Sequence, residues 1–114
     1  MATTVLVASG NGVAIDPSGT ELAQVDVAQY RTVRITAANW AFSPTSIRVA
    51  IVHVTSPGTP ETGAIDALDS YTLGPDENTS TSYDVPGDTI LMSVRSTTDS
   101  AGCRVFFTIY GRPD

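Results

Sequence analysis

The amino-acid sequence predicts an all-β protein, an antiparallel, jelly-roll-like β-sandwich of about eight to nine short strands. Three observations support this fold class. Apolar and polar residues alternate in many short runs, as side chains do along a strand. The chain is 41% hydrophobic and only 16% charged, and among its apolar residues Val and Ile, which favour sheets, outnumber Leu, Met and Phe. Turn-forming residues separate the runs at regular spacing, and no run has a convincing helical period.

The first strand is expected at Thr3–Ala8, followed by a return strand at Val13–Ile15. Between them lies Asn11-Gly12, a pair that favours a tight hairpin turn because both residues tolerate positive φ. The length fits a single domain covering residues 1–114. Residues 1–9 are then either an N-terminal arm or the first strand.

The next runs extend to residue 54. Asp16-Pro17-Ser18-Gly19 matches a type I turn. Alternating residues predict strands at 23–27 and 31–38, with a bend or bulge between them, and Pro44 indicates a loop at 39–44. The run that starts at Ile47 becomes apolar on both faces at Val52 and Val54, which predicts a central strand covered on both sides.

A loop is expected at Thr55–Gly63, which holds two prolines and two glycines. Ala64–Leu73 fits either a helix or a strand, and the flanking glycines and Tyr71 favour a strand with a bulge near Asp69. Thr79–Val85 is then a polar strand that ends at a Pro-Gly turn.

The clearest pattern lies near the C-terminus. In Cys103–Tyr110 every second residue, from Cys103 to Ile109, is apolar and faces inward; in Thr89–Arg95 the same holds for Ile90, Met92 and Val94. Seven residues of turn-type composition join the two runs. The simplest prediction is an antiparallel hairpin that closes a sheet.

The charge distribution argues against nucleic acid as a partner. The formal net charge is −6, and all six basic residues are arginines scattered along the chain. Such a protein lacks the basic patch that a phosphate backbone requires. The absence of lysine excludes Schiff-base chemistry. No signal peptide and no apolar run of about 20 residues is present, so we expect no membrane association and synthesis in a reducing cytoplasm.

No catalytic residue, metal site or cofactor site is predicted. His53, the only histidine, continues the inward alternation, which favours a place at the end of a strand near the core over the role of a catalytic base. Cys103 is the only cysteine and is expected to be buried. The acidic residues near turns do not follow the spacing of a calcium-binding loop, so surface solvation is the preferred interpretation. We therefore expect a protein that is not an enzyme.

Residues for partner binding are expected in three segments. The N-terminal segment contributes Thr3, Thr4 and Val5, the loop before Pro44 contributes Trp40 and Phe42, and the proline-rich loop contributes Pro57 and Pro60. Trp40, Phe42, Tyr30 and Tyr71 offer two alternatives. If exposed together they would stack on a sugar ring or a partner protein, and if buried they would plug one end of the sandwich, which is the preferred interpretation.

The short lysine-free chain, its all-β pattern and the IYGR sequence that follows a YDVPG turn, within Tyr83 to Arg112, resemble the small jelly-roll proteins that decorate the heads of tailed phages. The resemblance implies a non-enzymatic virion structural protein, a capsid decoration or cement protein assembled in the host cytoplasm. Its partner would be a capsid protein or another protein lattice, bound as a homo-oligomer with a trimer favoured. The alternative is a carbohydrate-binding β-sandwich module that uses Trp40.

Overall fold

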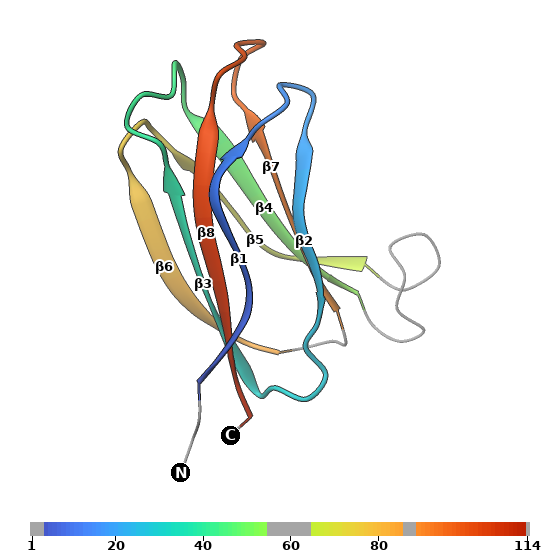
Figure 1. Ribbon diagram of the computed structural model, residues 1–114. Helices are drawn as coiled ribbons and strands as arrows, with labels where there is room; N and C mark the ends of the chain where they lie inside the picture. Colours follow the sequence, from blue (N-terminus) through green and yellow to red (C-terminus); the bar gives the residue numbers. More distant parts are fainter. Residues whose placement is uncertain (1–3, 55–64, 86–88, 114) are drawn as a thin grey trace.

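The computed structural model describes residues 4–54, 65–85 and 89–113, which form eight β-strands and no helix (Figure 1). They lie in two four-stranded antiparallel sheets packed face to face. The predicted all-β, jelly-roll-like sandwich is confirmed. The strands are β1 (Val5–Ala14), β2 (Thr20–Asp26), β3 (Thr32–Asn39), β4 (Ile47–Val54), β5 (Ile65–Leu73), β6 (Asn78–Asp84), β7 (Thr89–Ser96) and β8 (Arg104–Arg112).

The chain passes from one sheet to the other at almost every connection. The front sheet has the order β1-β8-β3-β6 and the back sheet the order β2-β7-β4-β5, so β4 and β5 are the only consecutive described strands that pair with each other. We call the end of the sandwich that holds residues 15–19, 40–46, 74–77 and 97–103 the upper end (Figure 1). Residues 27–31, Thr4 and Pro113 lie at the lower end.

The core lies between the sheets, where every second residue of the inner strands is buried. This follows from the two-residue period of the strands, and each fully buried Val or Ile contributes about 1.5–3 kcal/mol relative to an exposed one. The buried hydrophobic residues are Ile15, Val27, Val33, Ile35, Ala37, Ile47, Val49, Ile51, Leu73, Ile90, Met92, Val94, Cys103, Val105, Phe107 and Ile109.

The predicted closing hairpin is wrong, although the inner faces of its strands are correct. β7 pairs with β2 and β4 in the back sheet, whereas β8 pairs with β1 and β3 in the front sheet. The connection between them crosses the upper end of the sandwich. Cys103 is buried there as predicted, and its Sγ lies 3.7 Å from the carbonyl oxygen of Thr45. Alternation reveals which face of a strand is buried, but not which strand lies beside it.

The predicted hairpin at Asn11-Gly12 is also wrong. β1 runs through this pair as one strand of ten residues, antiparallel to β8. The register shifts between Gly10 and Val13, and Gly12 has a φ of 71°. The positive φ thus forms a β-bulge inside a strand and not a turn between two strands. Val5 to Ser9 belong to this strand.

The predictions for the back sheet are confirmed in part. β4 lies between β7 and β5, as expected for a central strand, but only its inner face is covered, since Ile51 is buried while Val52 is half-buried. β5 is a strand, and its register against β4 shifts at Leu68, next to Asp69, where a bulge was predicted.

A hydrogen bond joins the two sheets at the edge formed by β5 and β6. The Tyr83 hydroxyl in β6 donates to a carboxylate oxygen of Asp69 in β5 at 2.6 Å. Desolvation, and then this bond, raise the pKa of Tyr83 above its ordinary value. Desolvation together with the charge of Asp69 raises the pKa of Tyr71 to about 12. Both tyrosines are therefore neutral across the physiological pH range.

Candidate functional site

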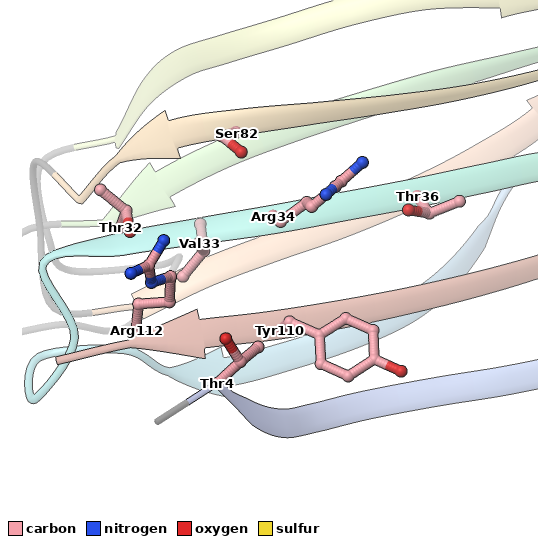
Figure 2. A pocket seen from close by; sticks show the side chains of 8 residues that line it. All are labelled: Thr4, Thr32, Val33, Arg34, Thr36, Ser82, Tyr110 and Arg112. Atoms are coloured by element: carbon pink, nitrogen blue, oxygen red, sulfur yellow. The ribbon is translucent and has the colours of Figure 1, made fainter. Parts of the chain in front are cut away.

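A groove of about 550 Å³ lies on the outer face of the front sheet. β3, β8 and β6 contribute most of its walls, and the residue that precedes β1 completes it (Figure 2). Side chains with hydroxyl groups and two arginines dominate the lining. The lining residues are Thr4, Thr32, Val33, Arg34, Thr36, Ser82, Tyr110 and Arg112.

The strand register brings these residues together from distant parts of the sequence. Arg34 of β3 lies opposite Tyr110 of β8 on one side and opposite Ser82 of β6 on the other. Thr32 lies opposite Arg112. Partners in register that point to the same face have Cβ atoms about 4.5–5.5 Å apart. The two arginines therefore project from the same patch of the sheet.

Hydrogen bonds fix the orientation of Arg34. Its Nε donates to the hydroxyl of Ser80 at 2.8 Å, and the hydroxyl of Thr36 lies 2.9 Å from the same oxygen. A guanidinium carries five N–H donors, and the bond from Nε leaves the four on the terminal nitrogens for a ligand. A side chain held in this way loses less conformational entropy when it binds.

Arg112 stands at the lower end of the groove, near Thr4 and Thr32 (Figure 2). It is exposed, and within the described chain its guanidinium forms neither an ion pair nor a hydrogen bond. Tyr110 is half-buried and its ring extends along β8. The groove thus combines two positive charges, an aromatic ring and several hydroxyl groups.

This arrangement can bind a ligand through positive charge, hydroxyl groups and an aromatic ring. Among the described residues, no Asp, Glu, His or Cys lines the groove. Among residues 4–54, 65–85 and 89–113, no three His, Cys, Asp or Glu side chains are grouped so as to hold a metal ion. Those residues also contain no helix long and apolar enough to cross a membrane.

His53 and Cys103 do not share a site. Cys103 contacts Thr45 at the upper end, while His53 is buried near the far end of β4. At about 3.3 Å per residue, the stretch of β4 before His53 places it roughly 20 Å from Cys103. The prediction that both lie within the fold near the core agrees with their burial.

Trp40 and Phe42 lie in an anchored loop at the upper end. The Trp40 amide donates to the carbonyl of Arg104 at 2.9 Å, and the Ser43 hydroxyl accepts from the Arg104 amide at 3.1 Å. Trp40 is half-buried, but Phe42 is 76% exposed, so the interpretation that these rings plug the sandwich is wrong for Phe42.

These rings do not form a flat platform for a sugar. The planes of Trp40 and Phe42 meet at 67° with centroids 5.3 Å apart, and the Arg104 guanidinium lies over the Trp40 ring at 6.0 Å. Tyr30 lies at the lower end, where it packs so closely that a Cβ added at Gly111 would fall 2.6 Å from its ring. The predicted aromatic residues are therefore not gathered on one surface.

The structure describes only some of the residues of the N-terminal segment and the proline-rich loop that were predicted to bind a partner. Thr4 is exposed and lines the groove, and Val5 begins β1 with 40% exposure. Thr3, Pro57 and Pro60 lie outside the described residues.

The sequence interpretation missed Arg34, Tyr110 and Arg112 as site residues. Alternation did place Arg34 on the outward side of its strand. The missing information was the pairing of β3 with β8, which joins positions 34 and 110. No local pattern in the sequence reports that contact.

The same fold occurs in solved structures that share little sequence with this chain. A chain of Bacillus endospore appendages, described as disulfide-linked pili, is 15% identical with a TM-score of 0.54, over 100% of this chain and 88% of that chain. The SPBc2 prophage-derived protein YomS is 14% identical with a TM-score of 0.53, over 98% and 93%. Murine APRIL is 8% identical with a TM-score of 0.59, over 96% and 98%.

These likenesses establish the fold and not a ligand or an activity. They support the resemblance to jelly-roll-like proteins, one of which is prophage-derived. Carbohydrate-binding modules are also similar, but their TM-scores of 0.42 and 0.47 are too low to carry an argument. No protein-family model and no curated protein sequence matches the chain.

Proposed function

We propose that this protein is a non-enzymatic structural component of a phage particle that decorates the capsid and stabilises it through protein contacts. The observation that carries the proposal is the exposed apolar start of edge strand β1. Val5 is 40% exposed and Leu6 is 53% exposed. Neighbouring residues of a strand point to opposite faces, so β1 presents an apolar side chain on each face at its lower end.

The backbone of β1 adds to this surface. Its only strand partner in the front sheet is β8, so the other side of β1 is an open edge within the described chain. An open edge with apolar side chains is a template for a strand of another protein unless it is covered. A capsid protein that adds a strand here would pair with the β1 backbone and cover Val5 and Leu6.

Two of the similar structures support this function. The jelly-roll-like fold occurs in a prophage-derived protein and in a chain of an assembled fibre. Under the proposal this protein is located in the virion, assembles in the host cytoplasm and binds its shell as a homo-oligomer, with a trimer favoured. Its partner is a protein lattice and not nucleic acid or a membrane.

The test is binding to empty shells assembled from the major capsid protein of a tailed phage. The double variant Val5→Ser with Leu6→Ser should bind at least about tenfold more weakly in co-sedimentation, because it removes the apolar contact at the edge. Phe106→Ser, which changes a ring of β8 that is 37% exposed and lies near Gly12, away from the start of β1, is the matched control and should bind like the parent protein. Full binding by the double variant, or loss of binding by the control, would contradict the proposed surface.

Substitution is a sharper test than truncation. Deleting residues 1–9 would remove half of β1, whose residues from Val5 to Ser9 pair with β8 between Thr108 and Gly111. Loss of binding after truncation could then reflect an unfolded sheet. Sedimentation velocity tests the oligomer separately, and a monomer at all concentrations would contradict the trimer.

A further inference from the structure

The geometry points to an acidic saccharide as the ligand of the groove on the front sheet. In this proposal Arg34 holds a carboxylate of the saccharide, Arg112 provides a second positive charge at the lower end of the groove, and a sugar ring lies against Tyr110. The inference does not rest on the proposed capsid function, because it is argued from Arg34, Arg112 and Tyr110, although the groove adjoins the start of β1, where Leu6 lies opposite Tyr110. The argument depends on charge, geometry and the chemistry of the lining.

The charge of the groove is opposite to that of the protein. The formal net charge of the chain is −6, yet the described residues of the lining include two arginines and no carboxylate. Among the described residues the nearest carboxylate in register is Asp84, which lies opposite Thr32, is not among the lining residues and forms no hydrogen bond or ion pair with either arginine. Two arginines that form no ion pair with the described residues favour an anionic ligand.

The geometry allows both arginines to reach one ligand. Arg112 is opposite Thr32, two residues from Arg34, so the two arginines are diagonal neighbours with Cβ atoms about 7–8 Å apart. The Ser80 bond turns the Arg34 side chain toward Thr36 and away from Arg112, so the two guanidinium groups face different parts of the groove and meet a ligand at two points (Figure 2). A planar carboxylate fits the paired N–H groups of a guanidinium, and the Ser80 bond already fixes the plane of Arg34.

The rest of the lining favours a sugar over other anions. Hydroxyl groups of Thr32, Thr36 and Ser82 can donate and accept hydrogen bonds, which matches the hydroxyl groups of a saccharide. The half-buried ring of Tyr110 offers an apolar face to the C–H groups of the sugar. Figure 2 shows Arg112 at one end of the groove, with Tyr110, Arg34 and Thr36 further along the strands.

Size and overall charge restrict the ligand further. A volume of about 550 Å³ lies in the range of sites for small molecules, which is about 300–1,000 Å³. A nucleic acid would bring a dense row of phosphates toward a protein with six excess negative charges, and this repulsion disfavours it. A saccharide with one carboxylate per ring brings less negative charge and fills the same space.

Isothermal titration calorimetry with oligogalacturonate, oligomannuronate and sialyllactose tests this inference on the full chain. The matched uncharged probes are methyl-esterified oligogalacturonate and lactose, and inorganic phosphate tests for simple anion binding. We expect saturable binding of at least one acidic saccharide, weaker binding at high salt, and at least tenfold weaker binding of its uncharged counterpart.

The variants locate the site. Arg34→Gln and Arg112→Gln should each weaken binding about tenfold, whereas Arg48→Gln, an exposed arginine in a groove of the back sheet, should leave it unchanged. Thermal unfolding verifies that each variant folds. The inference is overturned if no acidic saccharide binds, if Arg34→Gln and Arg112→Gln bind like the parent, if the Arg48→Gln control weakens binding, or if the uncharged probe or phosphate binds as tightly. Calorimetry measures saccharide binding without shells, and co-sedimentation measures shell binding without saccharide, so this inference and the capsid function can fail independently.

Discussion

A single hydrogen bond from the Tyr83 hydroxyl joins the two sheets at the side where β5 and β6 are edge strands. β5 and β6 are the terminal strands of their sheets, and strand pairing does not connect them. The 2.6 Å bond from Tyr83 to Asp69 bridges this edge and involves a charged acceptor. Hydrogen bonds to charged groups are stronger than those between neutral groups.

Replacing this residue tests its contribution. Tyr83→Phe keeps the ring but removes the donor, and we expect the free energy of unfolding to fall by about 1–2 kcal/mol. Urea denaturation followed by circular dichroism measures the loss. Tyr110→Phe is the control, since the Tyr110 hydroxyl forms no hydrogen bond within the described chain. Equal stability of the two variants would show that the bridge contributes nothing.

The bulge in β1 illustrates how one residue shapes an element. Gly12 adopts a φ of 71°, which glycine accepts without steric strain, and the register against β8 shifts at this point. The bulge lets one strand of ten residues follow the curved edge of the front sheet. It also disrupts the open edge of β1, which limits unwanted pairing along that part of the strand.

Gly12→Ala isolates the cost of the backbone conformation. A Cβ at this position would lie 3.7 Å from the Phe106 ring, an ordinary contact, so no steric clash contributes. We expect the free energy of unfolding to fall by about 1 kcal/mol or more because a residue with a side chain is strained at this φ. Ser9→Ala on the same strand should change the free energy of unfolding by less than about 0.5 kcal/mol. A Gly12→Ala protein as stable as the parent would contradict the strained bulge.

At the scale of the whole molecule, the fold depends on pairing between distant parts of the chain. β1 pairs with β8, and β3 pairs with both β6 and β8. To form such contacts the chain must first close long loops, which costs conformational entropy. This cost slows folding. β4 and β5 form the single hairpin among the described residues, so folding has little local structure from which to start.

Folding kinetics test this dependence on topology. We expect refolding from urea to take roughly milliseconds to seconds, as in other all-β sandwiches. Stopped-flow fluorescence of Trp40, the only tryptophan, would follow the reaction. Refolding within microseconds would contradict the view that distant strand pairs limit the rate.

Local patterns in the sequence are enough to place most of the strands and their buried faces. Ile90, Met92 and Val94 point inward as their alternation predicted, and the turn at Asp16–Gly19 forms with the expected hydrogen bond from the Gly19 amide to the Asp16 carbonyl, 2.9 Å long. These features depend on neighbours in the sequence. A period of two and the conformational limits of turn residues are local properties, so they can be read without a fold.

The neighbours of each strand, and the place where a ligand could bind, depend on the tertiary structure. β7 and β8 share the inward pattern of a hairpin but lie in different sheets, and Asn11-Gly12 became a bulge because β8 extends along the whole of β1. Arg34 and Tyr110 meet across 76 positions of the sequence through the pairing of β3 with β8. Strand pairing depends on the free energy of the whole sandwich, and a local pattern of side chains does not contain it.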